Sequence, residues 1–373
     1  MKRLPARKAP GPDGFTGIFF KKCWAIVKPD IMRVIHRFDS LHTSNLQWLN
    51  SANVVLLPKK DGAEGISDYR PTSLIHAIAK IIAKVLSLRL APHMDALISN
   101  AQSAFIKKRS IHDNFMYVRN FARRLHKRKT PALLFKLDIR KAFDSVKWEF
   151  ILDLLQRRGF PSKFRDWIAA LLCSSSSRFL LNGLPGPPIY HGRGFRQGDP
   201  ILPLLFVLAI DPLHQILELA TRKGLLHKIR GRGAMMRTSL YADDAAIFMA
   251  PIKSDVDNLA TILKGFGDVT GLCTNFHKSS VVPIRCANVD LDHVLSGIPV
   301  SRATFPMKYL GLPLSVWQLK RVDFQYLEDK AAGKLVTWEG QNITAMGSTT
   351  LVNSVLCSQA VFSVTPLIVP KVT

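Results

Sequence analysis

Three carboxylates stand at the ends of short apolar segments that lie far apart along this chain. Residues 132–138 (ALLFKLD) have the pattern of a strand that ends in Asp138. Residues 240–249 (LYADDAAIFM) predict a tight hairpin with Asp243 and Asp244 at its turn. The surrounding order of strand, helix, helix, hairpin, helix and strand is typical of a split βαβ, ferredoxin-like sheet. Such a sheet brings Asp138 beside the two hairpin acids.

The other patterns make the chain a mixed α/β protein. Residues 53–57 (NVVLL) predict a short strand, and apolar residues recur at helical steps from Ile75 to Leu90. Ser145 is expected to cap a helix that starts at Val146. Asn182-Gly183 indicates a further hairpin.

Two more helices are expected on the same grounds. One covers residues 113–129 and is strongly basic. The other opens at Ser254 and is closed by Gly271, a residue suited to the end of a helix.

The chain carries a large excess of positive charge. Lys and Arg number 52 against 27 Asp and Glu, which gives a formal net charge of +25. This excess has to face something anionic, and nucleic acid is the leading candidate. Carboxylates gathered in so basic a chain imply bound cations, because like charges repel unless metal ions neutralise them. Oxygen ligands suit Mg²⁺, and two such ions about 3.5–4 Å apart support phosphoryl transfer.

A membrane surface is the other anionic partner that a basic chain can have. The longest apolar run, Ile201 to Ile210, contains Pro203 and is too short for a spanning helix, which needs roughly 20 residues. The first ten residues, MKRLPARKAP, lack the apolar stretch of a secretory signal. We therefore expect an intracellular protein without a membrane partner. Its five cysteines are scattered, which predicts reduced thiols and no structural zinc.

Eight sequence blocks occur in the order of one known family. The chain resembles the reverse transcriptase domain of plant LINE-type (non-LTR) retrotransposons over roughly residues 8 to 315. The blocks are KAPGPDGFTGIFFKKCW, DYRPTSL, AQSAFIKKRSIHDN, FKLDIRKAFDSVKW, GRGFRQGDPILPLLF, YADDA, GLCTNFHKSS and KYLGLPL. Any one block alone is weak evidence, whereas coincidence does not explain all of them in order.

The resemblance implies an α/β (α+β) right-hand polymerase with fingers, a ferredoxin-like palm and a partial thumb or connector at the C-terminus. The expected divisions are an N-terminal extension over 1–52, fingers over 53–131, a palm over 132–285 with a fingers insertion near 160–192, and the partial thumb over 286–373. It also implies the activity of an RNA-directed DNA polymerase. The partners would be an RNA template, a DNA primer and dNTPs.

The resemblance assigns the metal ligands. Asp138 corresponds to the first metal-binding aspartate of the family, with the backbone carbonyl of Ile139 as an extra ligand. Asp243 and Asp244 correspond to the catalytic pair, and Asp243 is expected to be the more direct ligand. The implied cofactor is a pair of Mg²⁺ ions, with Mn²⁺ as the alternative.

Four further residues are expected to contact the nucleotide, its phosphate or the nascent base pair. A bulky aromatic at Phe143 would exclude a 2′-hydroxyl and select deoxynucleotides; a core aromatic after a strand is the alternative. Gln197 and Gly198 would border the nascent base pair, and Arg196 a phosphate; a Gly-rich loop before a helix is the alternative.

Basic residues of the fingers are expected near the triphosphate. Lys59, Lys60 and Arg70 are the candidates, and a solvated turn is the alternative for Lys60. Lys278 is expected near the active site, where it would protonate the leaving pyrophosphate. Cations that could contact template backbone without reading sequence lie between Arg119 and Lys129 and at Lys2, Arg3, Arg7 and Lys8; a solvated face is the alternative, and no single residue is assigned.

Two departures from the family pattern keep a second function open. Thr72 replaces an aliphatic residue, and Leu202 stands where a small polar residue is usual. They leave the alternative of a truncated, catalytically weak or dead retroelement relic that only binds nucleic acid. A group II intron maturase is disfavoured because no basic RNA-binding extension is recognised. The family resemblance suggests the nucleus as the location, and the sequence gives no oligomeric state.

Overall fold

A five-stranded sheet carries the three acids in the computed structural model, which describes residues 4–42, 45–229, 236–333, 344–357, 362 and 365–367. Its strand order is β10-β9-β3-β8-β7. The strands are β3 (Ala132–Leu137), β7 (Thr238–Tyr241), β8 (Asp244–Met249), β9 (Ser280–Ile284) and β10 (Ser301–Arg302). Strand β3 is central and pairs antiparallel with both β8 and β9. The mixed α/β fold with this predicted sheet is confirmed.

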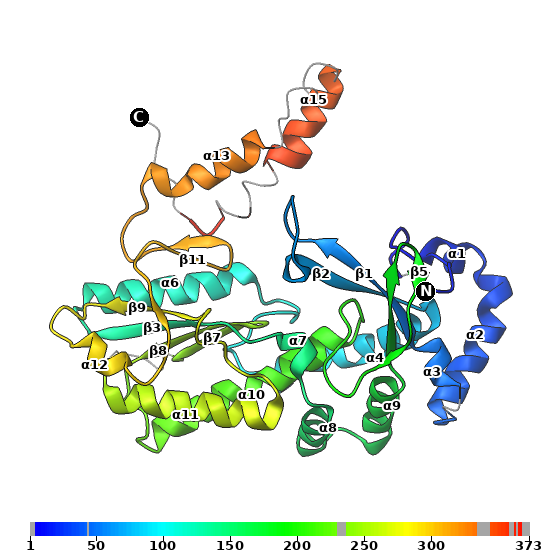
Figure 1. The fold of residues 1–373 in the computed structure, drawn as a ribbon, viewed down its shortest axis with the longest axis horizontal. Helices are drawn as coiled ribbons and strands as arrows, with labels where there is room; N and C mark the ends of the chain where they lie inside the picture. Colours follow the sequence, from blue (N-terminus) through cyan, green and yellow to red (C-terminus); the bar gives the residue numbers. More distant parts are fainter. Residues whose placement is uncertain are drawn as a thin grey trace.

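Alternation along β3 directs its apolar side chains to two different cores. Leu133, Phe135 and Leu137 belong to a large core that includes residues of α10 (Leu202–Arg222) and α11 (Lys253–Thr270). Leu134 belongs to a second core together with residues of α6 (Ile111–Lys127). Figure 1 shows α10 and α11 on one side of the sheet and α6 on the other. The sheet is therefore buried on both faces.

Helix α10 is longer than the apolar run on which the sequence prediction rested. By length and composition alone it is a candidate membrane span, the one such helix among the residues described. Of its most apolar 18-residue window, 67% is buried inside the molecule. The expectation that no segment is long enough to span a membrane was therefore wrong. The burial of α10 is that of a core helix.

A second sheet lies beside the first, with the order β2-β1-β4-β5 and β6 paired to β4. Its strands are β1 (Ser51–Pro58), β2 (Tyr69–Ile75), β4 (Ser176–Leu181), β5 (Leu184–Pro185) and β6 (Ile189–Tyr190). Asn182 and Gly183 form the predicted turn between β4 and β5, both with positive φ. Strand β1 also pairs in parallel with β4, which joins segments more than 100 residues apart.

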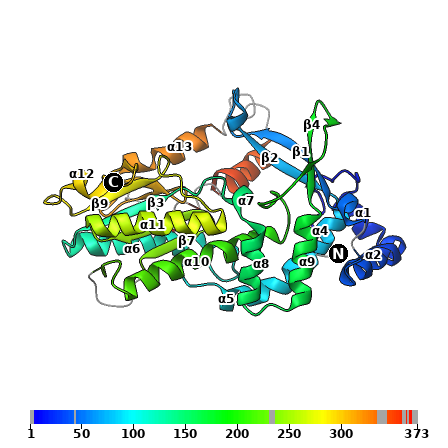
Figure 2. The ribbon, with the colours of Figure 1, turned by 60° about the horizontal axis from the view of Figure 1, so that its bottom comes forward.

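The remaining helices of the first 173 residues lie in this part of the chain, and Met94, Ile151 and Trp167 from them belong to the large core. They are α1 (Gly17–Lys22), α2 (Trp24–Asp39), α3 (Leu46–Leu49), α4 (Ala77–Leu90), α5 (Met94–Leu97), α7 (Ala142–Ser145), α8 (Trp148–Arg157) and α9 (Ser162–Cys173), with single 3₁₀ turns at Ile66–Asp68 and Ala91–His93. Figure 2 shows α8 and α9 side by side near α4.

Three predicted helix starts shift in the structure. Ser145 ends the short helix α7, and α8 begins after Lys147, so Ser145 caps nothing. Helix α11 follows Ile252, and Ser254 lies inside it, whereas Gly271 ends it at φ +84° as expected. Helix α6 begins two residues earlier than predicted because the Ser110 side chain accepts the backbone N–H of Asp113 and caps it.

The C-terminal part begins with α12 (Leu291–Leu295) and the hairpin β11 (Met307–Tyr309) and β12 (Leu312–Leu314). A 3₁₀ turn at Arg321–Phe324, α13 (Gln325–Ala332), α15 (Ala345–Leu351) and a π-helical turn at Val352–Leu356 follow. Tyr309, Leu312 and Leu314 of the hairpin belong to the same core as α6.

Candidate functional site: an aspartate cluster at the sheet edge

The backbone register aligns the three acids. Strand β3 ends at Leu137, which pairs with Ala245, so the next residue, Asp138, lies level with Asp244 across the ladder. On the other side of the hairpin, Tyr241 pairs with Asp244. Ala242 and Asp243 form the intervening turn, and Ala242 has φ +52°. The sheet thus brings Asp138 level with the hairpin acids, as the strand order predicted.

The backbone of Asp138 is fixed by the turn that precedes β9. Its N–H donates to the hydroxyl of Ser279 at 3.0 Å, and its carbonyl accepts the N–H of Asn275 at 2.8 Å. The Ser279 hydroxyl in turn donates to the carbonyl of Asn275 at 2.7 Å. Among the described residues, no hydrogen bond or ion pair engages the Asp138 carboxylate itself. That carboxylate is positioned by its main chain and left open for a ligand.

The acids repel one another. Burial raises the pKa of Asp243, its own backbone N–H opposes the rise, and the Asp138 carboxylate adds to it. Burial also raises the pKa of Asp244, the Asp243 charge raises it further, Lys136 opposes the rise, and Asp138 adds the smallest contribution. Lys136 makes no ion pair with them and donates to the carbonyl of Lys308 at 3.1 Å. Charge at this edge is therefore left largely uncompensated by the described side chains.

The three acids offer the oxygen ligands that a hard divalent cation prefers, but they do not enclose a metal site. Carboxylate oxygens under mutual repulsion are what Mg²⁺ neutralises. However, within the described part of the chain, no three His, Cys, Asp or Glu side chains are close enough together to hold a metal ion. Asp138, Asp243 and Asp244 are neighbours across an open edge.

Gln102 secures the hairpin turn, a role that the sequence did not predict. Its side-chain carbonyl accepts the N–H of Ala242 at 3.1 Å, and its amide donates to the Ala242 carbonyl at 3.4 Å. Residues 101–103 run beside Leu240, whose N–H donates to the Ala101 carbonyl at 2.7 Å. The only sequence signal was a polar residue between small ones in the block AQSAF.

A second buried chain of polar groups lies beneath the hairpin. The Asn114 amide of α6 donates to the carbonyl of Leu240 at 2.8 Å. The Tyr309 hydroxyl of β11 donates to the Asn114 side-chain oxygen at 2.9 Å. These contacts join three elements that are remote in sequence, so no local pattern could have revealed them.

The loop 192–198 lies between the acid-bearing sheet and the second sheet. Phe195 donates its N–H to the carbonyl of Phe143 at 2.6 Å, and the half-buried Phe143 ring stacks on Phe206 with centroids 4.2 Å apart. At the other end of the loop, the backbone carbonyl of Gln197 accepts the N–H of Ser73 at 3.3 Å. Gly198 has φ +109° and is exposed like Gln197. Both expected nucleotide-contacting residues of the loop are thus free to meet a ligand.

The prediction of a phosphate contact by Arg196 was wrong. The side chain is buried, donates to the carbonyl of Asn50 at 2.5 Å, and lies 3.6 Å from Asp199 in an ion pair. Its guanidinium hydrogen-bonds inside the protein, to Asn50, the residue between α3 and β1.

The basic residues expected near the triphosphate are exposed. Lys59 donates to the carbonyl of Ser67 at 2.7 Å, and Lys60 pairs with Asp68 at 3.2 Å. Arg70 projects from β2 opposite Leu57. Lys278 lies in the turn whose first residue, Asn275, bonds Asp138. The turn therefore ties Lys278 to the acid-bearing edge, whereas no described contact links the other three to it.

Two cations of the basic helix have structural tasks instead of the predicted template contact. Arg119 is buried and donates to the carbonyl of Pro366. Arg123 donates to the carbonyls of Ser315 and Trp317 at 3.2 and 2.8 Å. Lys2 and Arg3, also predicted to contact template, lie outside the described residues.

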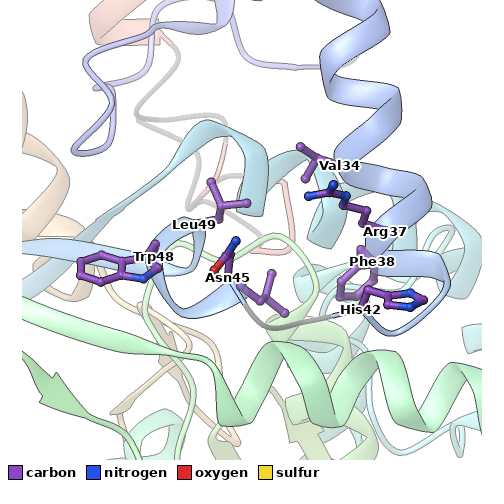
Figure 3. Close-up of a pocket in the computed structure, with 8 residues that line it drawn as sticks. Val34, Arg37, Phe38, His42, Asn45, Trp48 and Leu49 are labelled. Atoms are coloured by element: carbon purple, nitrogen blue, oxygen red, sulfur yellow. The ribbon is translucent and has the colours of Figure 1, made fainter.

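A cavity of about 910 Å³ lies away from the acids, between α2 and α3. Figure 3 shows Arg37, Phe38 and His42 on one side of it and Asn45, Trp48 and Leu49 on the other. No carboxylate lines it, so it has no part in the acid-bearing edge.

Comparison with known proteins decides the family. The profile of the family "Reverse transcriptase (RNA-dependent DNA polymerase)" matches residues 57–314. The chain belongs to this family. The membership agrees with the polymerase class predicted from the sequence. The matched region contains Asp138, Asp243 and Asp244 as well as the loop 192–198.

Similar proteins place this reverse transcriptase domain among those of non-LTR elements. It is 28% identical over 367 residues to the transposon TX1 149 kDa protein of Xenopus laevis, covering 96% of this chain and 27% of that protein. It is 26% identical over 321 residues to the Pol polyprotein of the retrotransposable element R2DM of Drosophila melanogaster, covering 83% and 29%. The chain thus spans less than a third of these relatives.

Solved structures of telomerases also resemble the reverse transcriptase domain. One is a telomerase from Candida albicans in complex with a fragment of telomeric RNA. It shares 13% identity, with a TM-score of 0.47, over 78% of this chain and 51% of that one.

Proposed function

We propose that this chain is the catalytic core of an RNA-directed DNA polymerase, which copies an RNA template by adding dNTPs to a primer 3′-hydroxyl. The observation that carries the proposal is the register of β3, β7 and β8, which brings Asp138 level with Asp243 and Asp244 within a reverse transcriptase domain. The finer affiliation that we propose is a LINE-type element of plants, with the nucleus as its place of work.

In the proposed reaction, Asp138 and Asp243 hold two Mg²⁺ ions, with the Ile139 carbonyl as an additional ligand and Asp244 in a lesser part. When bound, the ions neutralise charge on the attacking hydroxyl and on the leaving phosphate oxygens. Ser279 and Asn275 hold the main chain of Asp138, while Gln102 holds the turn that carries Asp243. The residues of this chain thus act by positioning carboxylates, the condition for strong electrostatic catalysis.

The proposed substrate contacts rest on the positions of these residues in the family pattern. We propose that Phe143 lies under the sugar, and that Gln197 and Gly198 border the new base pair. Lys59 and Arg70 would bind the triphosphate, and Lys278 would protonate pyrophosphate as it leaves. The corresponding divisions are fingers over 53–131, a palm over 132–285 and a partial thumb beyond it.

Primer extension on an RNA template with Mg²⁺ tests the proposal. The parent should extend the primer, while Asp138→Asn and Asp243→Asn should each lose nearly all activity, because an amide removes the negative charge that a metal ligand needs. Asp166→Asn is the matched control, since Asp166 is an exposed aspartate of α9 and should leave extension unchanged.

A non-catalytic relic is the competing outcome. It would bind RNA in a salt-sensitive manner and yield no product with any divalent metal. The two departures from the family pattern do not favour it: Leu202 is buried in the large core at the start of α10, and neither Leu202 nor Thr72 contacts the acids in any described interaction.

A further inference from the structure

One arginine in the segment before α6 bonds several main-chain groups at once. The side chain of Arg109 is 15% exposed. Its Nη1 donates to the carbonyls of Ser99 and Gln102 at 2.5 and 2.7 Å. Its Nη2 donates to the Asp95 carboxylate at 2.7 Å and to the Ile98 carbonyl at 3.3 Å. Because the guanidinium is a rigid planar fork, Arg109 fixes a bend of the preceding chain around itself.

A fully buried acid of α10, Asp211, holds the same bend. Its carboxylate accepts the N–H and the hydroxyl of Ser99 at 3.0 and 2.6 Å. It also accepts the guanidinium of Arg158 at 3.3 Å and the amide of Gln215 at 3.0 Å. A buried carboxylate needs partners of this kind. Ser99 is therefore fixed through its N–H and hydroxyl by Asp211 and through its carbonyl by Arg109.

The far end of this bend supports the hairpin that carries Asp243. Arg109 bonds the main-chain carbonyl of Gln102, and the side chain of Gln102 bonds both backbone groups of Ala242. The two neighbours of Gln102 also make backbone hydrogen bonds with Leu240, at 2.7 and 3.1 Å. A continuous series of hydrogen bonds thus runs from Arg109 to the residue before Asp243.

We propose that Arg109 is a positioning residue for Asp243 and acts through Gln102. The inference rests on the proposed function, because the carboxylate that it positions is the one that would hold the metal ions. Among the described residues, Arg109 makes no hydrogen bond or ion pair with the three acids of the sheet edge. It therefore contributes by keeping Gln102 in place. A lysine keeps the charge but lacks the planar fork, so it cannot replace this function.

Amide hydrogen exchange of the full chain, read by mass spectrometry with fragmentation to single residues, tests the proposal without requiring catalysis. In Arg109→Lys, residues 99–103 and 240–243 should exchange about tenfold faster than in the parent, because hydrogen bonds to a charged group are lost. The amides of β3 should exchange as in the parent, since its two ladders do not involve Arg109. Arg157→Lys, which changes an exposed arginine paired with Asp153, is the matched control and should alter neither region.

Two results of this experiment would overturn the proposal. One is exchange of residues 240–243 that equals that of the parent. The other is a rise of the same size along β3, which would assign Arg109 to global stability. Arg109→Gln replaces Arg109→Lys if the lysine variant does not fold. Failure of both variants to fold would make Arg109 a folding residue and would also refute the positioning role.

A double variant tests the route through Gln102. Gln102→Leu removes the acceptor of the Ala242 N–H, so adding Arg109→Lys should make the Ala242 amide exchange no faster than in Gln102→Leu alone. Additive effects of the two changes on this amide would mean that Arg109 reaches the hairpin by another route.

Primer extension separates positioning from substrate binding. Arg109→Lys should lower kcat about tenfold or more and leave the KM for dNTP as in the parent, because a misplaced carboxylate impairs the chemical step and not substrate affinity. A raised KM with unchanged kcat would contradict the proposal. If the parent itself extends no primer, the proposed function fails, while hydrogen exchange still decides whether Arg109 holds the hairpin.

Discussion

At the scale of single residues, Ala242 is one of nine described non-glycine residues with positive φ, and it directly precedes Asp243. A non-glycine residue at φ +52° is strained, and it persists only where its surroundings fix it. Here the fixing group is the amide of Gln102, which bonds both the N–H and the carbonyl of Ala242. The orientation of Asp243, the next residue, therefore depends on a side chain from a segment 140 residues earlier.

Gln102→Leu should uncouple the turn from that support. Leucine fills similar space but leaves two backbone groups of Ala242 without partners, which costs about 1–3 kcal/mol of unfolding free energy. Urea unfolding measures this cost, and primer extension should fall because Asp243 is no longer held. Gln156→Leu, at an exposed position of α8, is the control. Primer extension equal to that of the parent would mean that the hairpin turn does not need Gln102 to position Asp243.

Phe143→Ala should change the choice of sugar. In the proposed site the ring excludes a 2′-hydroxyl, so its removal should raise the kcat/KM for ribonucleotides relative to deoxynucleotides. The variant also loses the stacking on Phe206. Phe160→Ala breaks a comparable stacked pair with Phe164 and controls for that loss. Unchanged sugar discrimination would assign Phe143 to packing alone.

At the scale of elements, the loop 192–199 joins the two sheets. It forms hydrogen bonds with Phe143 of α7, with Ser73 of β2 and with Asn50, which lies between α3 and β1. The buried centre of this junction is Arg196 with Asp199. Burial raises the pKa of Asp199, and the Arg196 charge opposes that rise.

Arg196→Leu should therefore destabilise the fold strongly. Removing one partner of a buried pair leaves the other uncompensated, which costs about 3–5 kcal/mol. Urea unfolding of the variant measures the loss, with Arg193→Leu in the exposed part of the same loop as the control. The double variant Arg196→Leu with Asp199→Leu should recover part of the stability. Equal stability of parent and Arg196→Leu would contradict the assigned role.

Sequence patterns predicted elements well where the periodicity was local. The strand ending at Asp138, the acidic hairpin and the Asn182-Gly183 turn all form as expected. Strand β2 was not predicted from the sequence. It contains Pro71 and lies at the edge of its sheet, where proline is tolerated.

The supporting residues of the site could not be predicted. Gln102 meets the hairpin from 140 positions away, and the burial of Arg196 depends on Asn50, 146 positions away. Such partners are brought together by topology alone, so a polar side chain in a local pattern does not disclose whether it will face solvent. The acids were predictable because Asp138 follows an apolar strand and the other two lie at the turn of an apolar hairpin.

At the scale of the whole molecule, the net charge of +25 should govern affinity for nucleic acid. Each phosphate contact releases counterions, so binding of labelled RNA should weaken about a hundredfold or more between about 50 and 200 mM salt. Fluorescence anisotropy titrations at several salt concentrations measure the slope. Two unrelated RNA sequences should give the same slope, because backbone contacts do not read bases. Affinity that does not change with salt would contradict an electrostatic interface.

The central place of β3 has one more consequence. Strand β3 is hydrogen-bonded along both edges, so it cannot shift without breaking two ladders at once. The position of Asp138 at its end is therefore fixed. Any polymer copied against it has to advance past a fixed point, one unit for each bond made. The distance moved at each step would then be set by the repeat of the nucleic acid, while the position of Asp138 in the protein stays constant.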